Sequence, residues 1–465
     1  MNTQCKPQKI QLQEHGSRSV EVDFDGGMLT SDGGGLLLRE VEAQHGVVKG
    51  LADCFRDQRD SRFTEFSVEQ LVGQRVYGLA LGYEDLNDHD DLRRDPMMAV
   101  LTGRDDPLGG DRFSERDLGK PCAGKSTLNR LELSSAGTGG AKKIPVDAEA
   151  VERFFVDAFV KSRKSAPAQI VLDFDATDDP LHGEQEGRFF HGYYKHYCYL
   201  PLYVFCNGFL LAAKLRSSEI DASEGTVEEL ERIVGIIRES WPDVRILMRG
   251  DAGFGREEIM FWCEENGVDF ILGFAGNERL EKEVEAELEL ARRRRMRTGR
   301  PARVFKDFTY RTRTSWTKER RVVAKAEWTL KGANARYVVT SLPRRTVKAR
   351  RLYETLYCRR GQMENRIKEQ QLGLFADRTS TGKMKSNQLR LWFSSAAYML
   401  MHLLRRTALK GTEMAKAECG TIRVKLLKVA ARVVVSVRRV VFSLAGGCPY
   451  QKIIRQAHAN LAAPG

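Results

Sequence analysis

The sequence predicts an α/β fold in which helices flank a mixed sheet, with a β-rich insertion, a mainly helical N-terminal domain and a basic C-terminal segment. Two observations predict the sheet. An apolar run that ends in acid, IVLDFD at 170–175, is followed by two strand-like runs joined at Asn207-Gly208, a strong hairpin signal. From residue 226 onward, helical and strand patterns alternate. A meander followed by such alternation is typical of a mixed sheet covered by helices.

The elements of the central region follow in a defined order. Strands are predicted at 170–175, 195–206, 208–216, 244–251 and 268–274, and helices at 226–240 and 256–266. Thr226, with Glu229 three residues later, indicates a capping box at the start of the first helix. Basic strands at about 301–330 and a strand at 337–342 precede a long helix at about 348–372. This order resembles the ribonuclease H-like fold.

The two flanks differ from this centre. Residues 68–81 have a helical pattern behind Ser67, a suitable N-cap, and a further helix is predicted at 147–163. After residue 385 an apolar helix precedes basic runs, and the alternation from Arg432 to Phe442 predicts one strand. The chain thus divides into an N-terminal helical region (1–150), a ribonuclease H-like domain in two parts (151–275 and 337–385), a basic β-rich insertion (276–336) and a helical, basic C-terminal region (386–465).

Composition narrows the class of protein. The 465 residues are 42% apolar and 30% charged, as in ordinary globular proteins. No run approaches the roughly 20 apolar residues of a membrane-spanning helix, and the polar N-terminus lacks a signal-peptide core. The nine cysteines are scattered without a C-x-x-C pair, which indicates reduced thiols rather than disulfides or zinc. We therefore expect a cytoplasmic protein with no membrane association.

Charge is unevenly distributed along the chain. Residues 1–100 carry a net charge of −7 and residues 101–290 a net charge of −13, whereas residues 291–465 carry +32. Such a basic half attracts polyanions over long distances and releases counterions when it binds phosphates. The alternative is that these basic residues form a solvent-exposed surface that binds no ligand. Because basic residues alternate with aromatic and β-branched ones in FKDFTYRTRTSWTKERRVV (305–323), nucleic acid is the favoured partner.

Three acids stand at positions that suit metal binding. Asp175 ends the first strand, with Asp173 two residues earlier on the same face, Asp251 ends the strand ILMRGD, and Glu364 lies within the long helix. Converging carboxylates repel each other unless a divalent cation lies between them, and Mg²⁺ or Mn²⁺ suits such oxygen ligands. Two such ions promote phosphodiester displacement. Alternatively, a single acid only caps a strand or forms an ion pair.

The long helix carries a mixed stripe of polar side chains. Tyr357, Arg360, Glu364, Lys368 and Gln371 recur at helical spacing on one face. The carboxylate can hold metal while the arginine and the lysine contact phosphates. The same charges also fit simple i,i+4 pairs on a solvent face, but such pairs leave the tyrosine unexplained.

These motifs resemble a family of known proteins. Tyr357-x2-Arg360-x3-Glu364 is similar to the Y-R-E-K signature of bacterial insertion-sequence transposases with an Asp-Asp-Glu (DDE) triad, in which D-x-T and D-x-G-F carry the two aspartates, as at 175–177 and 251–254. A β-rich insertion precedes the glutamate in that family also. Phrases along most of the chain, such as SDGGG (31–35), resemble the insertion sequence 1380 family. The signature lysine is replaced by Gln371, with Lys368 one turn earlier.

The resemblance implies a metal-dependent DNA transposase that works by cut-and-paste. Asp175, Asp251 and Glu364 correspond to its catalytic and metal-binding triad, with two Mg²⁺ or Mn²⁺ ions, while Asp173, Tyr357, Arg360 and Lys368 are accessory candidates. The expected partners are inverted-repeat ends, target DNA and a second copy of the chain in a synaptic homodimer, in the bacterial cytoplasm. An insertion-domain aromatic stacks on a displaced base in that family, a role for which Trp316 and Trp328 are candidates, although either also suits a core position.

Two further readings stay open. A structure-selective nuclease on the same fold, without strand transfer, fits the charge pattern equally well, and so does a DNA binder without catalysis. GKPCAGKS (119–126) matches a phosphate-binding P-loop, but the polar segment before it does not suit the strand that a P-loop requires. We therefore interpret it as a loop before a DNA-contacting helix. The predicted DNA-contacting residues are Lys125, Arg130, Arg311, Arg313, Trp316, Arg320 and Arg321.

Overall fold

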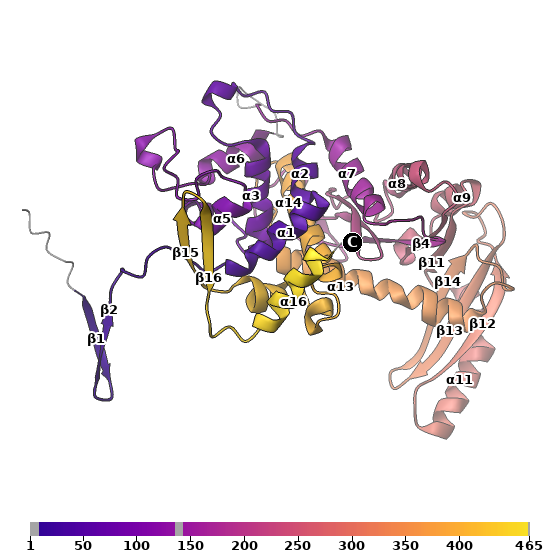
Figure 1. Cartoon of the computed structure of the whole chain (residues 1–465). Coiled ribbons are helices and arrows are strands. Elements are labelled where there is room, and N and C mark those ends of the chain that lie inside the picture. Colours follow the sequence, from indigo (N-terminus) through magenta and orange to yellow (C-terminus); the bar gives the residue numbers. More distant parts are fainter. Residues whose placement is uncertain (1–8, 135–142, 464–465) are drawn as a thin grey trace, which may run out of the picture.

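A large mixed sheet forms one half of the molecule and a helical body the other (Figure 1). The computed structural model describes residues 9–134 and 143–463. Eight strands pair in the order β12-β13-β14-β11-β10-β4-β8-β9. Their bounds are β4 (Gln169–Ala176), β8 (Leu202–Cys206), β9 (Phe209–Lys214), β10 (Arg245–Gly250), β11 (Asp269–Phe274), β12 (Ala302–Tyr310), β13 (Arg320–Thr329) and β14 (Gly332–Thr340).

The centre of the sheet follows the predicted meander and alternation. Strands β4, β10 and β11 are parallel, whereas β8 and β9 form an antiparallel hairpin beside β4. Asn207 and Gly208 make the hairpin turn with φ angles of 50° and 91°, as two-residue turns of this kind require. The parallel connections contain α8 (Thr226–Ser240) and α9 (Glu257–Glu265). The expected mixed sheet with helices is confirmed.

The insertion extends this sheet. Strand β14 pairs with the central strand β11, and β13 and β12 continue outward from it. Helices α10 (Glu278–Glu283) and α11 (Glu285–Thr298) lead into β12, and α11 contacts β12 and β13. Strands are thus present in the region predicted at about 301–330, but they belong to the same sheet as the central strands.

The helical body is built from both ends of the chain. Helix α14 (Met384–Arg406) is largely buried and contacts both α3 of the N-terminal part and β9 of the sheet, so it joins the two halves. Ser67 caps α3 in a capping box with Gln70, as its sequence indicates. The other helices are α1 (Leu36–His45), α2 (Val47–Ala52), α3 (Val68–Leu81), α4 (His89–Leu92), α5 (Pro96–Leu101), α6 (Lys125–Ser134), α7 (Ala148–Lys161), α15 (Cys419–Ile422) and α16 (Gln451–Ala462).

Three small sheets lie outside the large one. The hairpin of β1 (Ile10–His15) and β2 (Arg18–Val22) projects from the body (Figure 1). Strands β15 (Ala431–Ser436) and β16 (Arg439–Leu444) form a second hairpin, and β15 also pairs with β3 (Leu29–Thr30). The third sheet contains β5 (Asp179–Pro180), β6 (Phe189–His191) and β7 (His196–Tyr199) in the order β5-β7-β6.

The structure corrects four local predictions. The strand predicted at 195–206 is two strands, β7 and β8, separated by Leu200-Pro201, because proline cannot donate to a ladder. The strand predicted from Arg432 to Phe442 is the β15–β16 hairpin. Gly225, not Thr226, is the N-cap of α8, and Glu229 instead pairs with Lys214 and Arg232. The long helix at 348–372 is a short helix α12 (Ala349–Arg351), a π-helix (Leu352–Tyr357), a 3-10 turn (Cys358–Arg360) and α13 (Gly361–Leu374).

A glycine contact joins the two ends of the chain and gives a first prediction. An added Cβ on Gly34 would lie 1.7 Å from the carbonyl oxygen of Leu426, a backbone atom that cannot move aside easily. We expect Gly34→Ala to lower the free energy of unfolding by about 3 kcal/mol, the upper end of overpacking costs, measured by urea titration. Gly235→Ala is the matched control, because a Cβ there meets open space within α8 and is expected to stabilise by about 0.5–1 kcal/mol. Equal changes in the free energy of unfolding for Gly34→Ala and Gly235→Ala would contradict the close contact between Gly34 and Leu426.

Asp179 gives a second prediction, on pH. Its side chain is buried, neither carboxylate oxygen has a hydrogen-bond partner in the described part of the chain, and burial raises its pKa well above the ordinary value. As pH rises above about 4, the unfolded chain releases this proton while the folded chain retains it, so stability falls. Asp179→Asn should therefore stabilise the fold more at pH 8 than at pH 4.5 in urea titrations. The exposed Asp243→Asn serves as the control, and a pH-independent gain in Asp179→Asn would contradict the prediction.

Candidate active site

Asp175 and Asp251 lie near each other at the carboxyl ends of the two neighbouring central strands β4 and β10. The parallel register of β4 and β10 ends with Asp173 opposite Arg249, and Asp175 and Asp251 each follow two residues later along the chain, close enough for the charge of Asp251 to act on Asp175. Neighbouring strands are about 4.8 Å apart. Asp175 is 7% exposed, and Asp251 caps the turn that follows β10, because its Oδ1 accepts the Gly253 amide hydrogen at 2.8 Å. Both acids therefore occupy fixed backbone positions at the carboxyl ends of parallel strands.

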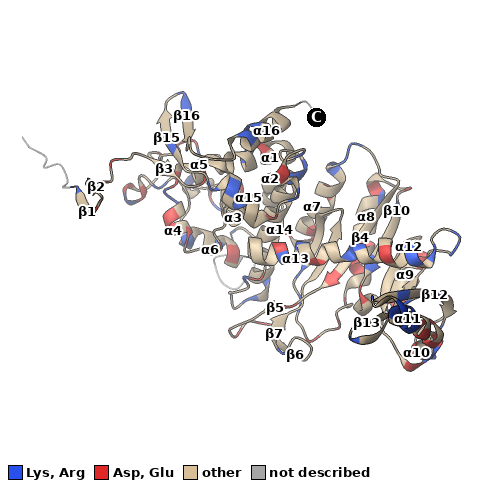
Figure 2. Cartoon of the chain, turned by 90° about the horizontal axis from the view of Figure 1, so that it is seen from below, with Lys and Arg blue, Asp and Glu red and all other residues tan. Residues whose placement is uncertain are grey.

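Glu364 reaches the same edge from α13, which contacts β4 (Figure 2). The guanidinium of Arg360 connects the acids: its Nη1 lies 3.2 Å from Asp175 Oδ2 and its Nη2 lies 2.7 Å from Glu364 Oε1. Because a single guanidinium contacts both groups, the carboxylates of Asp175 and Glu364 lie within a few ångströms of each other. The structure thus brings Asp175, Asp251 and Glu364 together.

The acids influence each other electrostatically. Burial raises the pKa of Asp175 to about 7; the Arg360 guanidinium acts in the opposite direction, and the charges of Asp251 and Glu364 raise it further. Burial acts to lower the pKa of Arg360, but the surrounding acids outweigh it and the pKa is raised. The cluster therefore favours a bound positive charge at this place.

The donor set fits a divalent metal ion. Three carboxylates at a sheet edge are the hard oxygen ligands that Mg²⁺ and Mn²⁺ prefer. Within the described ranges, no three Asp, Glu, His or Cys side chains are already grouped as a ready-made metal site. At this place Arg360 pairs with both Asp175 and Glu364, so an arginine supplies the positive charge between these two carboxylates.

Asp173 is engaged differently from Asp175. Arg249 on β10 donates to both of its carboxylate oxygens, at 2.6 and 2.7 Å, and also to the carbonyl oxygen of Leu356 at 2.5 Å. This bidentate pair is mostly buried. Asp173 therefore ties β4 and β10 to the π-helix that precedes α13, whereas Asp175 faces the other two acids.

The remaining residues of the helical stripe are spread around the site. Tyr357 is half-buried, and burial raises the pKa of its phenol. A Cβ added to Gly273 would lie only 2.7 Å from the Oη of Tyr357. Glycine at 273 thus lets the phenol reach β11 beside the Asp251 turn. Gln371 donates to the carbonyl oxygen of Asp178 at 3.0 Å. Lys368 is exposed and, among the residues described, has no ion-pair partner.

The predicted DNA-contacting residues divide into two groups. Lys125 and Arg130 on α6 and Arg311 and Arg313 between β12 and β13 are exposed. The other three are taken up by the fold, and we do not include them in a DNA surface: Trp316 is 3% exposed against Phe274 and Tyr310, Arg320 is buried between Glu257 and Glu264, and Arg321 pairs with Asp307 and two backbone carbonyls. Trp328 is half-buried.

In the described chain, no strand directly precedes the P-loop-like segment 119–126, although a P-loop requires one. A 3-10 turn at Glu115–Asp117 precedes the segment 119–126, and residues 36–124 of the described chain contain no strand. Lys125 instead begins α6 and pairs with Asp90. The geometry thus agrees with a loop before a helix.

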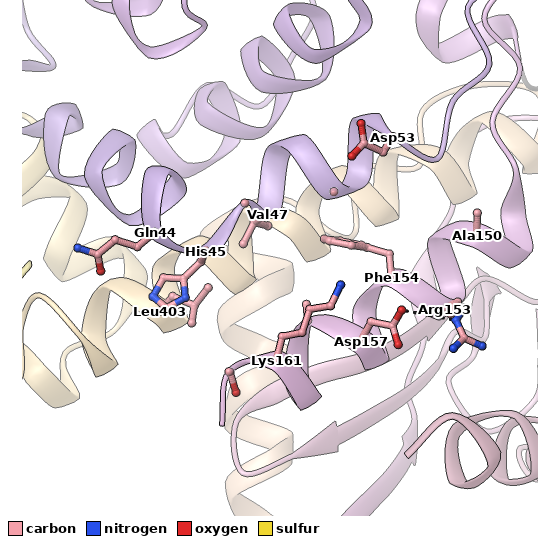
Figure 3. Close-up of a pocket in the computed structure, with 14 residues that line it drawn as sticks. Gln44, His45, Val47, Asp53, Ala150, Arg153, Phe154, Asp157, Lys161 and Leu403 are labelled. Atoms are coloured by element: carbon pink, nitrogen blue, oxygen red, sulfur yellow. Dashed lines mark ion pairs between the residues drawn. The ribbon is translucent and has the colours of Figure 1, made fainter. Parts of the chain in front are cut away.

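A pocket of about 500 Å³ lies elsewhere, between the α1–α2 segment and α7 (Figure 3). None of its lining residues belongs to β4, β10 or α13. Arg153 at its margin pairs with Asp157 on the same helix. The candidate active site at the carboxyl ends of β4 and β10 is therefore separate from this pocket.

One neighbour of the acids is missing from the predictions. Tyr194, in the turn between β6 and β7, is half-buried; burial raises its pKa, and the charges of Asp178, Asp175 and Asp251 raise it further. The interpretation of 195–206 as one strand hid this turn. Pro201, together with the aromatic cluster HGYYKHY, is the signal that indicates a separate hairpin here.

Comparisons with known proteins show the family to which the chain belongs. The family model described as Transposase DDE domain group 1 matches residues 12–464, and the chain belongs to this family of DNA transposases. A solved structure, the piggyBac transposase synaptic complex with hairpin DNA, is similar at 12% identity, covering 94% of this chain and 83% of that chain with a TM-score of 0.38. That score is too low for any feature of the complex to be transferred. Curated protein sequences give no match.

Two absences belong with these findings. No helix in the described ranges is long and apolar enough to cross a membrane. All eight cysteines within those ranges are free thiols.

The Asp173–Arg249 pair gives a third prediction. Removing one partner of a buried ion pair leaves an uncompensated charge, which costs about 3–5 kcal/mol. We expect that loss in the free energy of unfolding of Arg249→Met, measured by urea titration, and a large recovery in the double variant Arg249→Met, Asp173→Leu. The control is Arg256→Met, which breaks the half-exposed pair with Asp221 and should cost about 0–1 kcal/mol. Equal losses in the two single variants would contradict the role of the buried pair.

Proposed function

We propose that the chain is a cut-and-paste transposase of the insertion sequence 1380 family that cleaves phosphodiester bonds at element ends and joins the freed 3′ hydroxyls to target DNA. The observation that carries the proposal is that Arg360 pairs with both Asp175 and Glu364, while the charge of Asp251, at the end of the neighbouring strand, acts on Asp175. Membership of the DDE transposases supports the same chemistry. The strand order β9-β8-β4-β10-β11 supports a ribonuclease H-like domain.

The three acids would hold two divalent ions, Mg²⁺ or Mn²⁺. When bound, such ions supply Lewis acidity for the attacking and leaving oxygens of the phosphodiester. The chain's own residues prepare the site. The strand ends fix two of the acids, α13 delivers the third, and Arg360 is positioned to turn from the carboxylates to a phosphate.

DNA and a second copy of the chain are the proposed partners. The +32 charge of residues 291–465, together with the exposed Lys125, Arg130, Arg311 and Arg313, supports binding to phosphates. Lys368, one turn beyond Glu364 and unpaired in the described chain, is positioned to contact the cleaved strand. The homodimeric synaptic complex and the cytoplasmic location stay predictions from the sequence.

A cleavage assay tests the proposal. Linear DNA that carries the two borders of the encoding element is incubated with the full-length protein and Mg²⁺, and 3′ ends and joined products are mapped. We expect Asp175→Ala, Asp251→Ala and Glu364→Ala each to lose cleavage by at least about 100-fold, since even indirect supports of a metal site contribute up to that factor.

Asp243→Ala, an exposed acid in the loop before β10, is the matched control and should cleave like the wild type. Retained cleavage in Asp251→Ala would remove that residue from the mechanism and overturn the proposal. Cleavage without joined products would identify the nuclease alternative instead.

A further inference from the structure

An aromatic hairpin stands beside the candidate active site. We use this name for residues 188–197, which contain β6, the turn and the start of β7. Figure 2 shows β5, β6 and β7 together at the lower side of the molecule, near α13. Four rings in the hairpin are largely solvent-exposed: Tyr193 (82%), Phe190 (50%), Phe189 (45%) and Tyr197 (43%). Since exposed clusters of large apolar side chains usually mark binding sites, these rings require an explanation.

The hairpin is attached to the catalytic acids through a short segment. Asp178, three residues after Asp175, places its Oδ2 2.8 Å from His196 Nε2, and its carbonyl oxygen accepts from Gln371 on α13. Tyr194 lies close enough to Asp175 and Asp251 for their charges to affect it. The segment that carries the rings is therefore attached, through Asp178, close to the strand end that carries Asp175.

Contacts within the hairpin hold these rings in place. The ring of Tyr194 packs against that of Tyr193 at 5.0 Å between centroids, and Phe190 meets Tyr197 edge-on at 5.5 Å. The turn is closed by a hydrogen bond from the Lys195 amide to the His191 carbonyl at 2.8 Å. A surface fixed before binding loses little entropy when a ligand arrives.

Charge indicates what kind of ligand fits. Residues 188–197 contain Arg188, Lys195 and two histidines but no acid, and Arg188 pairs with Glu184, which precedes the hairpin. Lys195 is exposed at the tip, and the Arg188 guanidinium lies 4.6 Å from the centre of the Tyr197 ring. Rings combined with cations are the usual surface for single-stranded nucleic acid, because bases stack on the rings while cations contact the backbone. Paired bases within a duplex have no free faces to offer such rings.

We propose that the aromatic hairpin binds unpaired bases of the DNA strand next to the scissile phosphate, with Tyr193 and Phe190 as the main stacking residues. This proposal rests on the proposed function. It gives the stacking role to an exposed hairpin that follows β4, not to Trp316, whose ring is packed against Phe274 and Tyr310. The hairpin thus separates bases beside the cleavage point while the acids act on the backbone.

Binding measurements without cleavage test the hairpin. The probe is element-border duplex DNA with 2-aminopurine in a two-base unpaired segment beside the mapped cleavage position, titrated with full-length protein in EDTA. Wild type should quench the fluorescence by stacking. Tyr193→Ala and Phe190→Ala should each weaken binding of this probe by about 5- to 100-fold, the effect of losing one stacked base, and should leave binding of the fully paired duplex unchanged. Tyr193→Phe, which keeps the ring, should bind like the wild type.

Phe261→Ala is the matched control, because Phe261 is also 50% exposed but lies on α9. Melting temperatures close to that of the wild type would show that the variants fold, as expected for exposed positions. Unchanged affinity and quenching in the double variant Tyr193→Ala, Phe190→Ala would overturn this inference, and so would equal losses on paired and unpaired DNA. If the wild type cleaves border DNA while the double variant binds normally, only the hairpin proposal fails; if the wild type does not cleave at all, the proposed function fails.

Discussion

The parallel pairing of β4 with β10 is the constraint on which the site depends. Its register sets Asp173 opposite Arg249, and Asp175 and Asp251 follow two residues later along the two chain segments. A slip of one residue would move each of these side chains to the opposite face of the sheet. The charges of the buried Asp175 and the half-buried Asp251 repel, and the fold tolerates this because Arg360, just before α13, supplies positive charge. The cluster is therefore organised around a cation rather than around the acids alone.

Two arginines neutralise this edge in different ways. Arg249 uses three nitrogens on Asp173 and the Leu356 carbonyl, so its charge is committed to holding β4, β10 and the π-helix together. Arg360 makes one contact to each of two carboxylates, at 3.2 and 2.7 Å, and Glu364 is 48% exposed. A cation held by single contacts at a partly open position exchanges more easily than one in a buried bidentate pair. This difference supports Arg249 as a structural residue and Arg360 as a replaceable charge.

Local chemistry made part of this structure predictable. Ser67, Asn207-Gly208 and the acids at strand ends act through their own backbone neighbourhood, and the elements formed there as expected. Features set by distant residues were not predictable from pattern. Arg320 has the sequence environment of a DNA-contacting residue but is buried because Glu257 and Glu264, more than fifty residues earlier, meet it from α9. The sequence predicted the insertion as a unit separate from the central sheet, because its composition does not indicate that β14 pairs with β11.

The merged sheet also affects how DNA is handled near the acids. Because the insertion strands continue from β11, the insertion and the strand ends form one hydrogen-bonded unit. The aromatic hairpin is joined to β4 by residues 177–187 and is attached through β5 and the Asp178–His196 contact. Asp178 also accepts from Gln371 on α13 through its carbonyl oxygen, so this residue connects the hairpin with both β4 and α13. This connection provides a physical route by which base binding and the geometry of the acids influence each other.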